Sequence, residues 1–111
     1  PEGGLYLTQH EDPAIAAQDL IERGEARAAL ALLARAPQSA DVAAARSSAH
    51  LALGEAEAAL SAARQALQLD RHNPAASFNL GRALMEIGEP EPAAAAFADA
   101  ERLFPGVAEI S

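Results

Sequence analysis

The chain has 111 residues, a formal net charge of −8 and no cysteine, and alanine is its commonest residue. A chain of this length forms one domain that can bury a core without disulfide bonds. The acidic balance argues against a nucleic-acid binder, because few cations would meet a row of phosphates, and the lack of cysteine excludes thiolate chemistry.

Caps and prolines predict six helices after an N-terminal arm over residues 1–11. Asp12-Pro13 and Asn73-Pro74 each place an N-cap residue before a proline at the first helical position, and either Ser39 or Asp41 can cap the third helix. In chain order we predict helices over residues 13–23, 26–36, 40–53, 57–69, 74–87 and 90–104. They lie in one domain, 12–105, that a short tail, 106–111, follows.

One short phrase occurs three times along the chain. It reads GEARAAL at 24–30, GEAEAAL at 54–60 and GEPEPAA at 88–94, so the copies lie 30 and 34 residues apart. A period of this size is the signature of a helical repeat array. Each phrase joins two predicted helices by a short turn, so we expect an all-α fold of three antiparallel helix pairs.

This pattern resembles the tetratricopeptide repeat family, whose unit is a helix–turn–helix of about 34 residues. The third unit of the chain fits it best. Its first helix contains Leu80-Gly81, Gly88 is the turn residue, and Ala93, Phe97 and Pro105 follow at the positions that the family pattern assigns to small residues, an aromatic ring and a closing proline.

The first two units fit the family pattern less closely. The second departs from it at Arg46 and His50, where apolar residues are usual, and the first is four residues short. The resemblance covers about residues 11–105 and implies a right-handed α-α superhelix of three helix–turn–helix repeats.

Small residues are expected where the two helices of a pair cross. Ala59 and Ala93 hold these positions, and a larger side chain there would force the helices apart. Leu33, Ala63 and Phe97 are expected to fill the space between successive units, so that stacking completes the core.

The polar residues of the sequence predict neither catalysis nor a metal site. His10, His50 and His72 lie far apart and share no metal-binding spacing, and Ser47-Ser48 has no base at a useful spacing on its own helix. Acidic residues beside the turns are expected to favour the positive helix N-termini: Glu55, Glu57, Glu89 and Glu91. We therefore expect no enzyme, no cofactor and no metal.

Arg46 and His50 form an i, i+4 pair at positions that the family usually keeps apolar. Two interpretations stay open. The pair is either a polar patch between units, with Asp19 as a partner, or an exposed recognition spot.

The resemblance implies that the first helix of each unit lines a concave groove in which a partner peptide lies. Carried onto this chain, the groove residues are Gln18, Ser48, Phe78, Arg82 and Met85. Aromatic and methionine side chains beside an arginine suit peptide binding, and the alternative is that Phe78 and Met85 pack into the stack. The carboxylate clamp of one family subtype is excluded, because the matching positions lack its cations: Ala14, Gln18, Ala45, Ala75 and Asn79.

Protein binding is the function that the resemblance implies. We expect a scaffold that binds a protein or peptide partner in its groove, and the alternative is an accessory domain of a larger enzyme or secretion assembly. The last helix carries Leu103 and Phe104 beside the four alanines of 93–96, so we expect a weak homodimer through the C-terminal helices. The arm, which contains Leu5, Tyr6 and Leu7, is the other segment that could cover this apolar face of the last helix.

The sequence also bears on location. No apolar run reaches the roughly 20 residues of a membrane span, and no signal peptide is visible. We expect no membrane insertion and a cytoplasmic location, and a periplasmic one stays open if a leader was removed before Pro1. Arginine without lysine, in a chain so rich in alanine, is typical of a GC-rich, bacterial-type genome.

Overall fold

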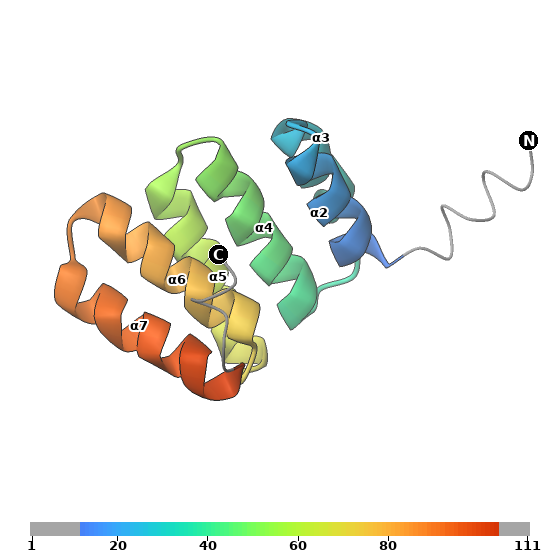
Figure 1. The fold of residues 1–111 in the computed structure, drawn as a ribbon. Coiled ribbons are helices and arrows are strands. Elements are labelled where there is room, and N and C mark those ends of the chain that lie inside the picture. Colours follow the sequence, from blue (N-terminus) through green and yellow to red (C-terminus); the bar gives the residue numbers. More distant parts are fainter. Residues whose placement is uncertain (1–11, 105–111) are drawn as a thin grey trace, which may run out of the picture.

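The computed structural model describes residues 12–104, which form six α-helices and no strand (Figure 1). The helices are α2 (Pro13–Glu22), α3 (Ala26–Ala34), α4 (Ala40–Ala52), α5 (Ala56–Leu69), α6 (Pro74–Ile87) and α7 (Pro90–Leu103). The predicted all-α class is confirmed, and the helix boundaries agree with the prediction to within two residues. The predicted arm and tail lie outside the described residues.

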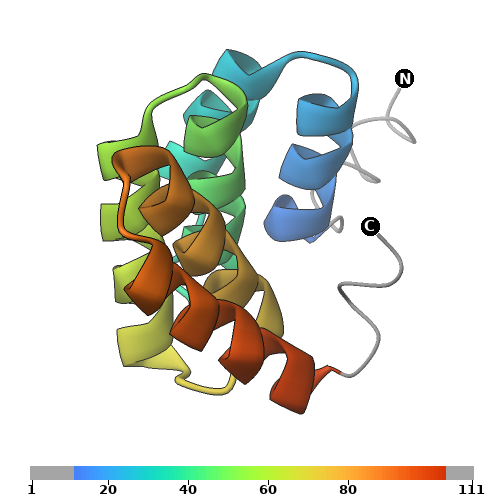
Figure 2. The same ribbon diagram turned by 60° about the vertical axis from the view of Figure 1, so that its left-hand side comes forward.

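The helices form three pairs that stack in chain order, α2 with α3, α4 with α5, and α6 with α7 (Figure 2). The central helix α4 contacts α2, α3, α5 and α6, whereas α7 packs only against α6 among the described elements. Between neighbouring pairs, α4 packs against both α2 and α3, and α6 packs against both α4 and α5. Each later pair is therefore joined to the pair before it through its own first helix, which packs against both helices of that earlier pair.

The repeated glycine–glutamate phrase makes the same turn three times. Gly24, Gly54 and Gly88 have φ values of 84°, 75° and 96°, in the left-handed region that a residue without Cβ enters at no steric cost. The next residue, always glutamate, donates its backbone N–H to the carbonyl five residues earlier, at 2.8 Å in all three turns. This is the helix-ending pattern of a Schellman motif, and it explains why the phrase recurs.

Side-chain caps begin the first helix of each pair. Asp12 accepts a hydrogen bond from the Ala14 N–H at 2.8 Å, Ser39 from the Val42 N–H at 3.1 Å, and Asn73 from the Ala76 N–H at 2.9 Å. Of the two predicted caps for α4, Ser39 is therefore the cap. The Asp41 carboxylate instead accepts a hydrogen bond from the Asn73 side chain at 2.9 Å, which links the starts of α4 and α6.

Alanine makes up most of the core. Ala59 and Ala93 are both fully buried, as predicted for positions where helices cross, and so is Ala63. Leu33 is fully buried in a cluster that contains residues of α2, α3 and α4, so it fills the space between the first two pairs. Small side chains let the helices approach closely, which gives the stack its thin core.

The prediction for Phe97 is wrong in its location. Phe97 is half-buried and lies within its own pair, where its ring meets that of Phe78 with centroids 5.6 Å apart. Gly81 makes room for this ring, because a Cβ there would lie 2.6 Å from Cε1 of Phe97. The ring of Phe97 therefore fills the gap between α6 and α7.

Candidate interaction surface

An open hollow of about 510 Å³ lies between α2, α4 and the start of α6. Three parallel first helices build it, which is the arrangement expected of a concave face. Its lining residues are Asp12, Ala14, Ile15, Gln18, Asp19, Glu22, Asp41, Ala44, Ala45, Ser48 and Ala75. The hollow is within the size range of protein sites that bind ligands.

The hollow has an apolar floor and an acidic rim. Four alanines contribute the small side chains that leave it open, and Ile15 stands beside them with 65% of its surface exposed. All of its charged lining residues are carboxylates: Asp12, Asp19, Glu22 and Asp41. A surface of this kind offers an incoming chain both apolar contact and a negative potential.

The five predicted groove residues divide between the hollow and the rest of α6. Gln18 and Ser48 line the hollow, and the other three do not. Arg82 is exposed, and Met85 exposes 54% of its surface. Phe78 is half-buried, with its ring tilted by 56° against the ring of Phe97. The ring of Phe78 therefore packs on α7, as the alternative interpretation predicted, and keeps some surface exposed.

Arg82 lies on the face of α6 that begins at the hollow and continues along the helix. Ala75 lines the hollow, and Arg82 follows seven residues later, so the two share one helix face. A chain lying in the hollow could continue along this face. The hollow and the α6 face together therefore form the candidate concave surface.

Asn79 is a buried polar residue of α6 to which the sequence assigned no role in the site. It is only 4% exposed, and its Nδ2 donates to Oγ of Ser47 and Oγ of Ser48, both at 2.8 Å, and to the Ala44 carbonyl at 3.2 Å. These bonds join α4 to α6 behind the hollow. The sequence did contain a signal for these bonds. Ser47 and Ser48 lie on the first helix of the second unit, and Asn79 lies on the first helix of the third.

Comparison with known families agrees with this arrangement. The family model described as tetratricopeptide repeat matches residues 50–110. The chain belongs to the tetratricopeptide repeat family. Repeats of this family are non-catalytic scaffolds that generally mediate protein–protein interaction. A search of curated proteins found no match to this tetratricopeptide repeat chain.

The family match begins in the last turn of α4 and includes α5, α6 and α7. The α2 and α4 residues that line the hollow precede it. The part of this tetratricopeptide repeat protein that fits the family pattern best is therefore not the part that forms the hollow. No helix of residues 12–104 is long and apolar enough to cross a bilayer.

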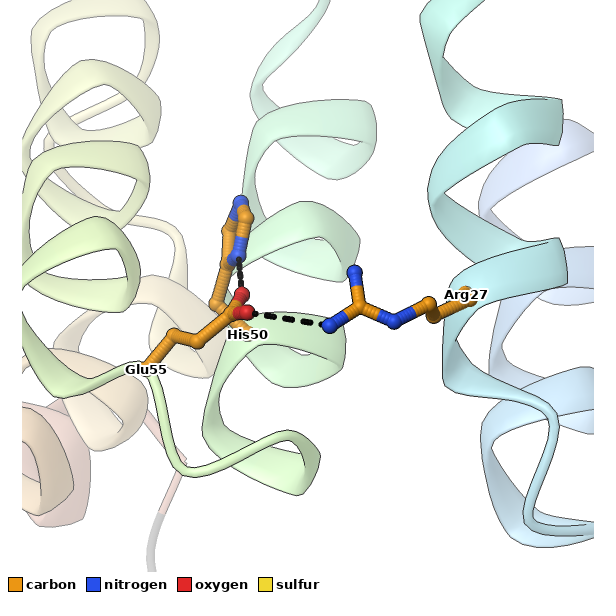
Figure 3. A network of polar contacts seen from close by, with 3 residues as sticks. All are labelled: Arg27, His50 and Glu55. Carbon is orange, nitrogen blue, oxygen red and sulfur yellow. Dashed lines mark hydrogen bonds and ion pairs between the residues drawn. The ribbon is translucent and has the colours of Figure 1, made fainter.

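A polar network joins the first two repeats on the other side of α4 (Figure 3). Nδ1 of His50 lies 2.8 Å from Oε1 of Glu55, and Nη2 of Arg27 lies 3.5 Å from Oε2 of the same carboxylate. The hydrogen bond from His50, with a smaller contribution from the nearby Arg27 charge, holds the pKa of Glu55 below its usual value. This network is a polar patch between units, as one of the two interpretations predicted for His50, but Arg46 is not part of it.

The partner predicted for that patch was wrong. Asp19 lies on the concave side, where it lines the hollow and forms an i, i+4 ion pair with Arg23 at 3.0 Å. The partner of His50 is instead Glu55, which the sequence analysis had assigned only to the helix N-terminus. The turn explains the difference, since it places Glu55 directly after the helix end that carries His50. Arg46 takes part in none of the ion pairs within residues 12–104.

Proposed function

We propose that this chain is a protein-interaction module that holds a segment of a partner protein in the hollow between α2, α4 and α6. The observation that carries the proposal is the hollow itself, which the first helices of a tetratricopeptide array line with small side chains. Segments bound in such grooves gain affinity from apolar contacts and from a few placed polar groups.

Gln18 and Ser48 supply polar groups for a bound backbone. The side chain of Gln18 is exposed, and its amide can both donate and accept a hydrogen bond. Oγ of Ser48 accepts a hydrogen bond from Asn79, and none of the hydrogen bonds within residues 12–104 uses its own O–H. The Ser48 hydroxyl is therefore oriented by Asn79 and can donate to a partner carbonyl.

The same segment would continue along α6. Arg82 could pair with a carboxylate or a carbonyl of the partner, and Met85 offers a flexible apolar contact. Phe78 supports this face from behind through its contact with Phe97. All five residues of the predicted groove then have a role, with Gln18 and Ser48 at the centre.

Photo-crosslinking from two exposed positions tests this function. A photoreactive phenylalanine at Gln18 should crosslink a partner protein in a lysate of the source organism, and the same group at Ser61, on the α5 side, should not. Crosslinking from Ser61 alone would place the partner on the opposite face and contradict the proposal. No crosslink from Gln18 with any lysate protein would also count against it.

The outer side of α7 supports a separate proposal of self-association. Among the described elements α7 contacts only α6, and Phe104 at its end exposes 54% of its surface. Ala94, Ala95 and Ala98 are exposed on the same helix. We propose that a second copy of the chain covers this side. Light scattering that gives the monomer mass of 11.4 kDa at high concentration would contradict the dimer.

A further inference from the structure

We infer that the segment held in the hollow is basic, so that the natural partner presents lysine or arginine side chains to the α2 side of the groove. This inference rests on the proposed function and adds the chemistry of the occupant. The argument depends on the charges that line the hollow, on their positions along the helices, and on the shape of the apolar floor.

The lining residues leave the hollow with an uncompensated negative charge. Asp12, Glu22 and Asp41 take part in none of the ion pairs within residues 12–104. Asp19 does pair with Arg23, at 3.0 Å, but both side chains are largely exposed and the pair is open to competition. No arginine is among the residues that line the hollow, and Arg23 meets it through the exposed ion pair with Asp19.

The helix dipole adds to the negative charge of the hollow toward the end of α2. The carboxylates of Asp12 and Asp41 lie at helix starts, where the helix dipole offsets part of their charge. Each also accepts a hydrogen bond, from the Ala14 N–H and from Asn73 respectively. Glu22 is the last residue of α2, where the dipole adds to its charge. Glu22 and Asp19 therefore form the seat for a cation.

The floor suits the stem of a long cationic side chain. Lysine and arginine bury their methylene groups on apolar surface while their charged ends stay in water. Ala14, Ala45 and the exposed Ile15 provide such a surface next to Glu22 and Asp19. A chain with apolar residues alone would leave Glu22 without an ion-pair partner, and an acidic chain would be repelled.

Two short fluorescent peptides test the inference by anisotropy titration. One contains alanine, leucine and lysine, and the other has glutamate at every lysine position. The basic peptide should bind at low salt, and the acidic one should not. In the double variant Asp19→Asn/Glu22→Gln, the loss of two partly exposed contacts should weaken binding about fivefold.

A second double variant tests whether the peptide is attracted by the site at Asp19 and Glu22 or by the net negative charge of the protein. Glu57→Gln/Glu91→Gln removes the same two charges from the exposed first turns of α5 and α7, away from the hollow. It should bind the basic peptide as the unaltered protein does. Equal weakening in both double variants would show attraction by net charge only and would overturn the inference.

Two further results would also overturn it. These are equal or tighter binding of the acidic peptide, and no binding of the basic peptide at low salt. Neither result decides the proposed function, because crosslinking from Gln18 tests whether the hollow holds any partner. If Gln18 crosslinks a partner and the basic peptide fails, the groove stands and only the charge of its occupant is wrong.

Discussion

The two ends of the array use the same helix positions with different side chains. With the glycine turns aligned, Phe78 on α6 corresponds to Ala44 on α4 and to Ala14 on α2. In the last pair the Phe78 ring packs against Phe97, whereas Ala14 and Ala44 line the hollow. At this position the last pair carries an aromatic ring, whereas the first two pairs carry the small side chains that leave the hollow open.

A second aligned position shows the same contrast in the core. Gly81 corresponds to Ser47 and to Ala17, and all three are buried. In the last pair the missing Cβ makes room for an aromatic ring, and in the middle pair a serine hydroxyl donates to the Ala44 carbonyl at 2.6 Å. The last pair is thus held by aromatic packing. The middle pair contacts it through a polar seam, which consists of the hydrogen bonds that Asn79 donates to Ser47, Ser48 and the Ala44 carbonyl.

Overpacking of the helix crossings should have the largest effect on stability. Ala59→Leu and Ala93→Leu should each lower the free energy of unfolding by about 1–3 kcal/mol, because both side chains are fully buried at close crossings. Ala98→Leu, on the exposed side of α7, is the matched control and should change it little. Denaturant melts that rank Ala98→Leu as the most damaging would show that the assigned crossings are wrong.

The polar seam between α4 and α6 should come next. Asn79→Leu keeps the volume but removes the donor shared by Ser47, Ser48 and the Ala44 carbonyl, so we expect a loss of about 1–2 kcal/mol. Ser48→Ala should cost less, since Ser48 is only half-buried and water can replace it as a partner. An Asn79→Leu protein as stable as the parent would mean that the seam does not join the pairs.

The Glu55 network should give a smaller effect that depends on pH. Because the folded state lowers the pKa of Glu55, its contribution is present above the ordinary carboxyl pKa and is lost as the pH falls through the folded value. Glu55→Gln should therefore lower the melting temperature at neutral pH, and the difference should shrink as the pH falls below the ordinary carboxyl pKa.

Glu89→Gln is the control for that pH series. Glu89 holds the same place in the last turn, but Leu84 stands where the middle turn has His50. Its substitution should give a smaller change at neutral pH. A Glu55→Gln difference that persists unchanged into acid would show that the charge of Glu55 is not the cause.

The smallest effect is expected for the proposed cation seat. Asp19→Asn/Glu22→Gln should change the free energy of unfolding by no more than about 0.5 kcal/mol, because exposed ion pairs contribute little. Thermal and urea melts check this. A large loss would mean that the two carboxylates support the fold, and their effect on peptide binding could then not be assigned to the hollow.

The sequence predicted the fold well because its signals are local. Helix caps, prolines and the three glycine turns act within a few residues, and each appears in the structure where it was expected. The period then gave the number of pairs. Ala59, Ala93 and Leu33 were recognised as core residues because a repeat frame fixes which helix faces meet.

The site was predicted only in part because it depends on side-chain contacts between different helices. The repeat frame identified Gln18 and Ser48 as residues of the concave side, and both line the hollow. It did not show that the Phe78 ring packs against Phe97, or that Asn79 turns inward to Ser47 and Ser48. These contacts join separate helices, and neither is visible in a single helical period.

The location of the partner is the central claim, and amide chemical shifts test it most directly. A peptide selected from a random library against the isotope-labelled protein should shift the amides of 14–22 and 44–48, and in Ala14→Phe, where a ring fills the hollow, the shifts should be lost. Shifts confined to the α5 side, around Ser61 and Gln65, or to α7 would contradict the account.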